Sequence, residues 1–426
     1  MMHTRHAVAA LLTVSIAVAA RAQDQPVAPR GQYVGHAFDT TWLPNEADQS
    51  QVVYADIVRE AGAAWMRLHF AIASVPSGGS VRMTSLLDGE VQQLDAAGLS
   101  MWSNTSAYFN GDSVLVELIA APHSRSNRLS VAMLEIEMRD EGALAGTPGQ
   151  CGICGADDRT TSTQPWVARL MSVGCTASVY TSCSCMVTAG HCSGGTVMQF
   201  NVPPSTAGCA LVNPPVADQF PVVNKLFASS GVGADWCVMT MGTNSLGQKP
   251  VQRYGAYRPL ASSASSTFLP VGSALDVWGY GVDATCTLSQ TQQRSTGAIT
   301  AVLASSLQFN DDIRGGNSGS SMHRNGELFG IVTHCQVNCP NHGTRIDLAA
   351  FAAARASLCA CSCNADVAPT GVVDVNDLLA VISTWGPCPA VPAPCLADIA
   401  PAPSGNGVVD VNDLLAVIST WGPCPF

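Results

Sequence analysis

Alternating apolar and polar positions mark the first third of the chain. Residues 65–70 (WMRLHF) place successive side chains on opposite faces, and residues 114–119 and 129–136 continue in the same manner. A period of two is typical of strands with two unlike faces. Asn110-Gly111 is a turn signal ahead of the second of these runs. We therefore predict a β-sandwich over residues 23–150, serving as an accessory domain or a prosegment without catalytic residues.

A second strand-rich region covers residues 151–358. Its apolar runs are short, and segments rich in glycine and proline separate them, which favours strands and turns over long helices. The runs lie at residues 167–173, 186–188, 236–241, 275–280 and 328–333. The chain as a whole is therefore predicted to be mainly β, with a change of pattern only at its C-terminal end.

The last region, residues 359–426, contains a repeat. Its first unit ends in GVVDVNDLLAVISTWGPCP, and the second unit repeats these residues without change. Leu378, Ile382 and Trp385 recur at helical spacing, so each unit is predicted to hold one short helix with this stripe in its core. Proline-rich sequence between the units is expected to form a semi-rigid spacer.

The N-terminus is typical of an export signal over residues 1–22. Arg5 gives a basic start, residues 7–20 are apolar, and small residues flank Arg21 before the expected cleavage after Ala22. This apolar run is shorter than the ~20 residues that span a bilayer, so no membrane span is predicted. We expect a secreted, extracellular protein, with a place at the cell surface as a further option.

Charge and cysteine content limit the possible partners. The net charge is −11, only 12% of the residues are charged and no run of Lys or Arg occurs, so nucleic acid is not an expected partner. All 17 cysteines follow the signal, which favours disulfides in an exported chain, and the odd count leaves at least one thiol free or paired between chains. Cys151 and Cys154 form a CxxC pair that could instead begin a zinc site, but no second ligand pair at suitable spacing is evident.

Three residues of the second region form a candidate catalytic triad. Ser318 lies in GGNSGS, whose glycines allow a tight turn that can aim the N–H groups of Gly316 and Ser318 at one point, as an oxyanion hole does. His191 follows a short apolar strand in VTAGHC, and Asp235 opens an alternating strand. A serine hydroxyl needs a neutral imidazole as its base, and the imidazole needs a carboxylate to hold its tautomer.

These assignments have competitors. Asp218 lies closer to His191 along the chain, but Asp235 is preferred because a strand follows it. Ser320 and Ser321 are alternative nucleophiles, although neither lies behind the Gly-Gly pair. Taken alone, GGNSGS could equally be an ordinary loop, because serine and glycine are common loop residues.

Taken together, the motifs resemble those of the chymotrypsin/trypsin-type serine endopeptidases. VTAGHC resembles the family's TAAHC histidine motif, GGNSGS resembles its GDSGG nucleophile motif, and the order His, Asp, Ser is the same. The resemblance implies a chymotrypsin-like double β-barrel over residues 151–358. It also implies hydrolysis of protein or peptide substrates through an acyl-enzyme, without a cofactor. A disulfide between Cys175 and Cys192, beside the histidine, belongs to the same resemblance.

The nucleophile motif departs from the family at one position. Asn317 lies where many members have an aspartate that pairs with a newly cut N-terminus. We therefore do not transfer that activation switch, and the motif is more similar to bacterial glutamyl-endopeptidase-type members. The site is expected to be preformed or released by removal of the N-terminal domain. A catalytically silent, protease-like binding or adhesion protein is the alternative function.

Substrate preference is predicted from the residues around the expected pocket. Asp312 lies six residues before Ser318, where trypsin-like members have an aspartate that binds Arg or Lys. Thr333 and His334 end the strand that resembles the family's substrate-pairing strand. Cys335 stands where an open pocket usually has glycine, which would narrow it. A basic residue is the preferred prediction, and acidic or small apolar residues are the alternatives.

The C-terminal repeat resembles type I dockerin modules, which are paired calcium loop-helix units that dock onto partner domains. A small α-helical tail with bound Ca²⁺ and a cohesin-like or surface partner is what this resemblance implies. The candidate oxygen ligands of the first unit are Asp366, Thr370, the Val372 carbonyl, Asp374 and Asp377, and those of the second are Asp398, Asn406, Asp410 and Asp413. Disulfides Cys363–Cys388 and Cys395–Cys424 are expected to close the two units.

Overall fold

The computed structural model describes residues 31–139, 152–359, 365–368, 372–389, 395–401 and 405–424. The predicted export signal, Cys151, Cys363 and Thr370 lie outside the described residues. Within the described ranges, no helix is both long enough and apolar enough to cross a membrane.

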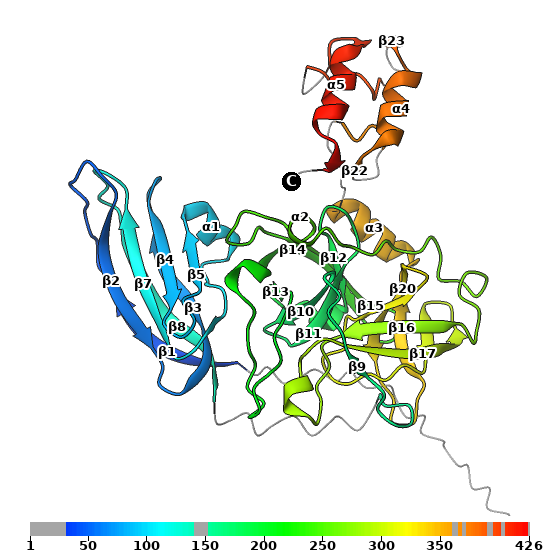
Figure 1. Cartoon of the computed structure of the whole chain (residues 1–426), viewed down its shortest axis with the longest axis horizontal. Coiled ribbons are helices and arrows are strands. Elements are labelled where there is room, and N and C mark those ends of the chain that lie inside the picture. Colours follow the sequence, from blue (N-terminus) through cyan, green and yellow to red (C-terminus); the bar gives the residue numbers. More distant parts are fainter. Residues whose placement is uncertain are drawn as a thin grey trace, which may run out of the picture.

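Two four-stranded antiparallel sheets form the N-terminal part (Figure 1). Their strand orders are β1-β8-β3-β6 and β2-β7-β4-β5, and the short helix α1 (Ala96–Met101) follows β5. The strands of the first sheet are β1 (Gln32–Asp39), β3 (Ala63–Ser74), β6 (Phe109–Asn110) and β8 (Arg128–Met138). Those of the second are β2 (Gln51–Arg59), β4 (Ser80–Ser85), β5 (Val91–Leu94) and β7 (Ser113–Ala120).

The alternation in the sequence explains how these two sheets bury their apolar side chains. Along β7 every second residue is buried, so Val114, Val116 and Leu118 enter one core while the residues between them are half-buried. Trp65 and Leu68 of β3 belong to the same hydrophobic cluster. Both sheets therefore contribute to a single core, as strands with one apolar face require.

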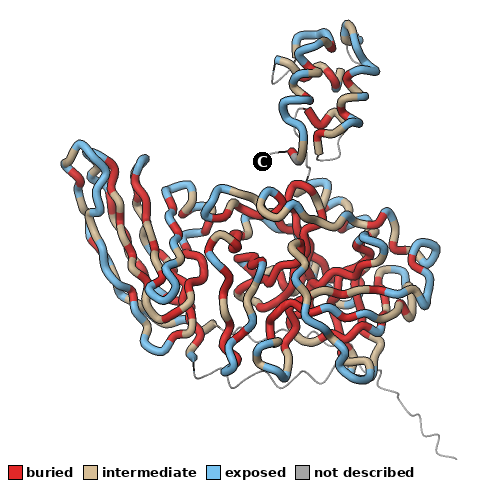
Figure 2. The backbone as a smooth tube through the Cα atoms, in the orientation of Figure 1, coloured by how far each residue is buried: buried red, intermediate tan, exposed pale blue. Residues whose placement is uncertain are grey.

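A closed six-stranded barrel follows. Its order is β10-β11-β12-β15-β14-β13. The β10 and β11 strands are buried at every position, because one face fills the barrel and the other is covered by neighbouring structure (Figure 2). The strands are β10 (Val167–Met171), β11 (Cys175–Val179), β12 (Met186–Thr188), β13 (Val197–Gln199), β14 (Gln219–Ser229) and β15 (Asp235–Met241).

A second barrel closes when β16 pairs with β17, and β9 (Thr160–Thr161) extends it at β17. Its order is β16-β19-β20-β21-β18-β17. Two six-stranded barrels confirm the mainly β class and the predicted chymotrypsin-like double barrel. The strands are β16 (Ala274–Gly279), β17 (Gln293–Val302), β18 (Ser306–Phe309), β19 (Ser321–Arg324), β20 (Glu327–His334) and β21 (Asn341–Arg345).

Short helices complete the barrel region. The α3 helix (Ala349–Leu358) packs Phe351 against Trp236 of the first barrel, with ring centroids 5.6 Å apart. The α2 helix (Pro250–Tyr254) lies between the two barrels in sequence. Three single-turn 3₁₀ helices, η2 (Gly190–Cys192), η3 (Val216–Asp218) and η4 (Cys286–Leu288), lie in loops. The η2 turn positions the candidate catalytic histidine.

The N-terminal sheets are firmly attached to the first barrel. The buried Arg67 guanidinium donates to Thr196 Oγ1 at 2.8 Å, across the junction. Gln219 and Tyr108 exchange two hydrogen bonds, with Tyr108 N donating at 2.9 Å and Gln219 Nε2 donating back at 2.8 Å. Leu211 of the barrel region is part of the N-terminal hydrophobic core. The two parts therefore share buried apolar and polar contacts.

The C-terminal repeat forms two short helices, α4 (Val375–Ser383) and α5 (Val411–Ser419), which stand apart from the barrels in Figure 1. The short strands cross between units: β22 (Val372–Val373) pairs with β25 (Gly422–Pro423), and β23 (Gly386–Pro387) pairs with β24 (Val408–Val409). Each two-stranded ribbon thus contains one strand from each repeat unit.

The predicted helical stripe is wrong in part. Ile382 and Trp385 are 51% and 52% exposed, whereas Val381 is fully buried and Leu378 is partly buried. The reason is the packing of the two short helices: Val381 of α4 and Val417 of α5 belong to the same small core. Each helix covers only a narrow face of the other, and the predicted stripe lies at the margin of that face.

The predicted disulfides of the tail are also wrong. Cys388 is bonded to Cys395, with an S–S distance of 2.05 Å and a Cα–Cα distance of 5.6 Å. Each sulfur forms one disulfide, so neither Cys363–Cys388 nor Cys395–Cys424 can form; Cys424 is disulfide-bonded in another pair. The physical reason is the short connection between the units, which brings its two flanking cysteines within bonding distance.

Candidate active site

The turn that carries His191 is fixed by a glycine. The chain leaves β12 and enters η2 at Gly190, immediately before the histidine. A Cβ atom at Gly190 would lie 1.7 Å from the backbone oxygen of Ala228 and 2.8 Å from Asp235 Oδ1. Only glycine lets the histidine turn approach the β14–β15 hairpin this closely.

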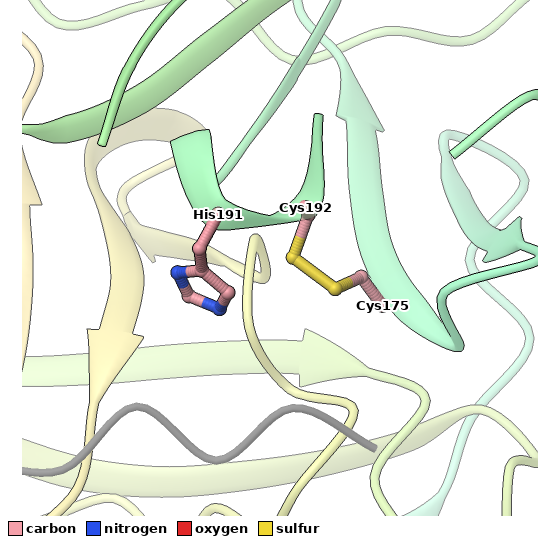
Figure 3. A group of neighbouring side chains, drawn as sticks. All are labelled: Cys175, His191 and Cys192. Atoms are coloured by element: carbon pink, nitrogen blue, oxygen red, sulfur yellow. A yellow bond between two sulfur atoms is a disulfide. The ribbon is translucent and has the colours of Figure 1, made fainter. Parts of the chain in front are cut away.

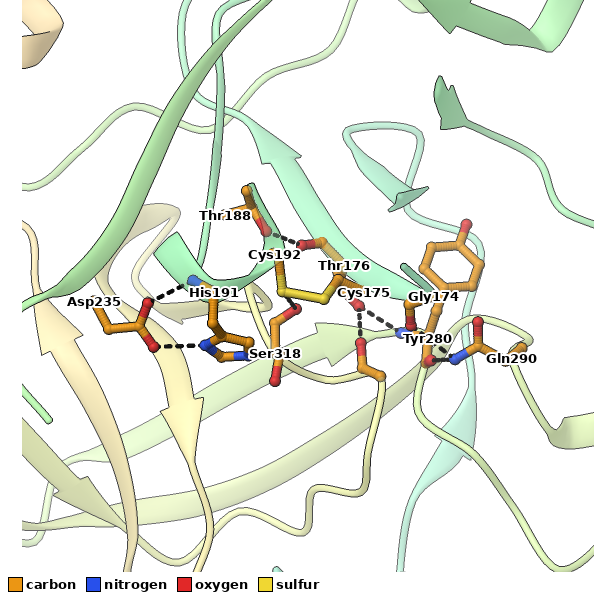
Figure 4. Close-up of a disulfide and its surroundings, with 11 residues drawn as sticks. Gly174, Cys175, Thr176, Thr188, His191, Cys192, Asp235, Tyr280, Gln290 and Ser318 are labelled. Atoms are coloured by element: carbon orange, nitrogen blue, oxygen red, sulfur yellow. Dashed lines mark hydrogen bonds and ion pairs between the residues drawn. A yellow bond between two sulfur atoms is a disulfide. The ribbon is translucent and has the colours of Figure 1, made fainter. Parts of the chain in front are cut away.

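Asp235 holds His191 at two points. Its Oδ1 accepts a hydrogen bond from the backbone N–H of His191 at 2.9 Å, and its Oδ2 lies 2.6 Å from His191 Nδ1. Asp235 is 1% exposed and is the first residue of β15 (Figure 4). A carboxylate accepts but cannot donate, so Nδ1 carries the proton and Nε2 is left as the basic nitrogen of the neutral ring.

Ser318 lies in a loop that passes between the barrels. Gly316 and Gly319 on either side have φ values of +98° and +84°, which glycine adopts at little cost. The Ser318 carbonyl accepts from Thr176 N at 2.9 Å, and Thr176 Oγ1 donates to the Gly316 carbonyl at 2.8 Å. In Figure 4 the Ser318 side chain lies beside the imidazole of His191.

Some backbone N–H groups around Ser318 donate to protein carbonyls and others do not. Asn317 N donates to Arg314 O at 2.9 Å, and Gly319 N donates to Val332 O at 2.8 Å. For Gly316 and Ser318, no protein acceptor is found among the described residues. Two N–H groups without a protein acceptor, one on the nucleophile candidate itself and one two residues before it, are what an oxyanion hole requires.

A disulfide joins Cys175 of β11 to Cys192 of η2, with an S–S distance of 2.04 Å (Figure 3). It is the bridge that the family resemblance implied. Together with His191, these two cysteines form a cluster of three residues whose types can ligate a metal. Disulfide sulfurs are not thiolates, so the cluster lacks the donors of a zinc site. The bridge instead ties the histidine turn to the neighbouring strand.

The competing residues have other partners. The Asp218 carboxylate pairs with Arg253 and accepts from the Tyr254 hydroxyl at 2.7 Å. Ser320 Oγ donates to Asn317 Oδ1 at 3.2 Å and is fully buried. Neither competitor is therefore available to the histidine.

Sequence analysis missed a buried network that contains the other alternative nucleophile. Ser321 Oγ lies 2.6 Å from Ser178 Oγ and 2.5 Å from His323 Nε2. The His323 ring lies 4.5 Å from the ring of Trp166, between centroids. Burial, and secondarily Arg258, lower the pKa of His323 to about 3. This serine–histidine pair is sealed from solvent, so it is a neutral structural link between the barrels. A lone histidine in a short strand of mixed composition carries no sequence signal of such a role.

The pocket beside Ser318 is lined by the loop that precedes this serine and by the end of strand β20, which follows it in the chain. Thr333 and His334, both predicted to contact substrate, are in its wall. The His334 ring lies 6.3 Å from the ring of His191, between centroids. The full lining is Ile313, Arg314, Gly315, Ser318, Val332, Thr333, His334 and Cys335.

Asp312 is not part of that lining, and its predicted role in binding a basic side chain is wrong. Asp312 Oδ1 accepts from Cys154 N at 2.6 Å, and Oδ2 accepts from Asp158 N at 3.0 Å. Burial raises the pKa of the carboxyl, although these backbone N–H groups oppose the rise. The physical reason is the chain segment before β9, which runs behind the pocket and turns the carboxylate toward itself.

One further histidine near the pocket was not predicted. His342 of β21 is paired with His334 in the strand register. Burial, and then the nearby His334, lower the pKa of His342, so its ring is neutral near pH 7. Its Nε2 lies 2.9 Å from Gln336 Nε2. His342 lies opposite His334 only because of the pairing register of β20 and β21, which the sequence does not show.

The carboxylates of the C-terminal repeat accept hydrogen bonds from backbone N–H groups. Asp377 accepts from Ala368 N and Asp374 N, both at 2.8 Å. Asp413 accepts from Ile399, Ala400 and Asp410; burial opposes its ionisation, but these N–H groups lower its pKa.

Four other predicted ligands contact the backbone in the same way. Asp374 and Asp410 cap α4 and α5, Asp398 accepts from the N–H groups of Asn406 and Gly407, and Asn406 Oδ1 accepts from Val408 N. A calcium ion needs six to eight oxygen ligands. The backbone contacts of these residues do not favour an ion, and calcium binding by the repeat stays a prediction.

Comparison with known proteins assigns the barrel region to a family. Residues 153–353 match the model of the trypsin family, so this part of the chain is a trypsin-family domain. No curated protein matches the chain.

Two solved structures are similar in fold. A Glu endopeptidase in complex with MPD is 20% identical, covering 48% of this chain and 98% of that chain, with a TM-score of 0.39. An inactivated protease paralogue of the scabies mite is 13% identical, covering 45% and 92% respectively, with a TM-score of 0.35.

Proposed function

With a trypsin-family domain as the premise, we propose that the protein is a serine endopeptidase whose triad is Ser318, His191 and Asp235. The observation that carries the proposal is the double contact of Asp235 with His191, at 2.9 Å on the backbone N–H and 2.6 Å on Nδ1. Two contacts fix both the position of the turn and the tautomer of the ring.

The chemistry follows from that tautomer. His191 Nε2 takes the proton of Ser318 Oγ while the oxygen attacks the carbonyl carbon of the scissile peptide bond. The negative charge that develops on the carbonyl oxygen is stabilised by the N–H groups of Gly316 and Ser318. The imidazolium then gives its proton to the leaving amine, and the C–N bond breaks to leave an acyl-enzyme. In the second half-reaction His191 deprotonates a water molecule, which attacks the acyl carbon. The ester bond to Ser318 Oγ then breaks, and His191 returns the proton to Ser318. These residues need no cofactor.

The substrate is proposed to bind in an extended conformation along the end of β20. Thr333 and His334 lie there, next to the pocket and to Ser318. Main-chain hydrogen bonds to such a strand give affinity without dependence on sequence, and the pocket gives specificity. This mode suits a protein or peptide substrate.

The N-terminal domain is proposed to remain attached as an accessory domain. Its contacts with the first barrel include a buried arginine and two reciprocal backbone–side-chain bonds, at Thr196, Tyr108 and Gln219. None of the residues that line the pocket takes part in these contacts, so the arrangement argues against an inhibitory prosegment. Purified full-length protein is expected to be active without further cleavage.

The C-terminal units are proposed to attach the exported enzyme to a protein partner. Trp385 and Trp421 are 52% and 53% exposed and occupy equivalent positions in the two units. Large exposed aromatic residues are typical anchors of protein interfaces. Replacement of both by alanine is expected to release the enzyme from the cell-surface fraction of the producing cells into the medium, without loss of activity. An unchanged distribution would contradict attachment through this surface.

The catalytic proposal is tested with a fluorophosphonate probe, which reacts only with an activated serine. We expect labelling of the wild type and of Ser320→Ala, the matched control, and no labelling of Ser318→Ala. No labelling of any of the three proteins would instead support a silent, protease-like binding protein. Labelling without cleavage of any protein or peptide would support an esterase.

A further inference from the structure

We propose that the specificity pocket accepts only small, uncharged side chains on the residue that precedes the cut bond. The cause is the chain segment 152–158, which closes the floor of the pocket. This inference rests on the proposed endopeptidase function and adds a substrate class to it. The argument depends on where the segment lies, on how it is held and on how much room it leaves.

The segment lies directly behind the pocket wall. Gly152 O accepts from Ile313 N at 2.9 Å, and Ile313 lines the pocket. Gly152 has a φ of +99°, and a Cβ atom there would lie 2.3 Å from Ile313 O. Asn341 Nδ2 also donates to Gly152 O, at 2.8 Å. Only a glycine backbone can approach the wall this closely, so the start of the segment packs directly against Ile313.

Two further connections hold the segment in place. Cys154 forms a disulfide with Cys339, which lies 185 residues later in the chain. The Asp312 carboxylate accepts from the backbone N–H groups of Cys154 and Asp158 at 2.6 and 3.0 Å. The aspartate that would select a basic substrate side chain is therefore used to anchor the segment. Its charge is directed away from the pocket.

The room that remains is small. Ile313, Val332 and the disulfide-bonded Cys335 line the pocket, and all three are buried. The space open to the centre of a water-sized sphere is ≈ 10 Å³. That is about the space that one water molecule needs. A methyl or hydroxymethyl group is of this size, whereas the side chains of Arg, Lys, Glu and Phe are several times larger.

The charge of the lining points in the same direction. No carboxylate belongs to the described lining, so a cationic side chain would find no ion-pair partner there. A glutamate carboxylate and the water bound to it would not fit in the space that remains. The size of the pocket therefore excludes both basic and acidic substrate side chains. The lack of a carboxylate in its lining is a second reason against basic side chains.

The test is a series of chromogenic tetrapeptides that differ only in the residue before the cut bond. We expect kcat/KM with Ala to exceed that with Arg, Glu or Phe by at least about 100-fold. Ile313→Ala removes atoms from the wall of the pocket and is expected to raise kcat/KM for Leu relative to Ala about tenfold. Val332→Ala is a second enlarging variant in case Ile313→Ala does not fold. The Asp312→Asn variant keeps one acceptor oxygen, and the Cys154–Cys339 disulfide and the Gly152–Ile313 hydrogen bond still hold the segment. It is therefore expected to leave the order of preference unchanged.

The outcomes separate this inference from the proposed function. A preference for Arg or Lys that disappears in Asp312→Asn would overturn the small-residue proposal and restore the basic one. A preference for Glu, retained in Asp312→Asn, would overturn it in favour of an acidic substrate. In both cases fluorophosphonate labelling of Ser318 would persist, because the probe carries no such side chain. Loss of that labelling in the wild type would refute the endopeptidase proposal, and this one with it.

Discussion

Replacing Asp235 by asparagine removes one charge from the candidate triad and almost no volume. The carboxylate accepts two hydrogen bonds, from His191 N at 2.9 Å and from Nδ1 at 2.6 Å. An asparagine side chain offers one carbonyl oxygen and one NH₂ group. If the oxygen stays on the backbone N–H, the NH₂ group faces Nδ1. The ring must then accept at Nδ1 and carry its proton on Nε2, so it can no longer take the proton of Ser318.

The expected loss is large because the wrong tautomer cannot act as a base. For a triad of this type the change costs about 10⁴-fold in kcat. At about 1.36 kcal/mol for each factor of ten, this corresponds to ~5.4 kcal/mol of transition-state stabilisation. The backbone contact of Asp235 with His191 would survive, so KM and folding are expected to change little.

The assay is peptide hydrolysis, with circular dichroism as a measure of folding. Asp218→Asn is the matched control, because Asp218 is also a buried carboxylate but pairs with Arg253 and Tyr254. The control variant is expected to lose some stability and to keep its kcat within a factor of a few. A folded Asp235→Asn protein with more than a tenth of the wild-type kcat would refute the assignment of Asp235 as the orienting carboxylate.

Three further predictions concern folding, pH and metal. Gly190→Ala should abolish soluble expression or activity, because its Cβ would lie 1.7 Å from Ala228 O; a folded, active variant would contradict the predicted close approach. Because the pKa of His323 falls from 6.5 to about 3, the unfolded chain binds the extra proton between these values. Stability should therefore fall as the pH drops from 6.5 toward 3, less steeply in His323→Gln; equal slopes in urea melts would exclude this role. Calcium or EDTA should shift the melting temperature of the full chain by less than about 1 °C, since the oxygens of Asp377 and Asp413 already accept backbone N–H groups, and a rise of several degrees with calcium would contradict this.

The double barrel was predictable because its strands and its key turns are local features of the sequence. Short apolar runs define β10, β12 and β15, and the glycines next to His191 and Ser318 mark turns that few other residues could form. The choice of Asp235 over Asp218 also rested on a local feature, the strand that follows it. Sequence was sufficient wherever the direction of a side chain is set by its own turn or strand.

Asp312 shows where sequence was insufficient. Its position relative to Ser318 predicted a carboxylate in the pocket, but its partners, Cys154 and Asp158, lie more than 150 residues away in the chain. The direction of the side chain is therefore decided by a long-range contact that no local pattern encodes. The tail disulfides failed for a related reason. The identical repeats suggested that each unit closes on itself, whereas Cys388 and Cys395 join across the connection between the units.

The mutual position of the histidine turn and the serine loop depends on one buried residue, Thr176 of β11. Its N–H donates to the Ser318 carbonyl at 2.9 Å and its hydroxyl donates to the Gly316 carbonyl at 2.8 Å. Its own carbonyl accepts from Thr188 Oγ1 at 2.7 Å, at the end of the strand that leads to His191. A single strand residue thus connects the serine loop to the histidine turn. Because all its polar groups are buried and bonded, a shift of either barrel would break several hydrogen bonds at once, which keeps the two candidate catalytic side chains in register.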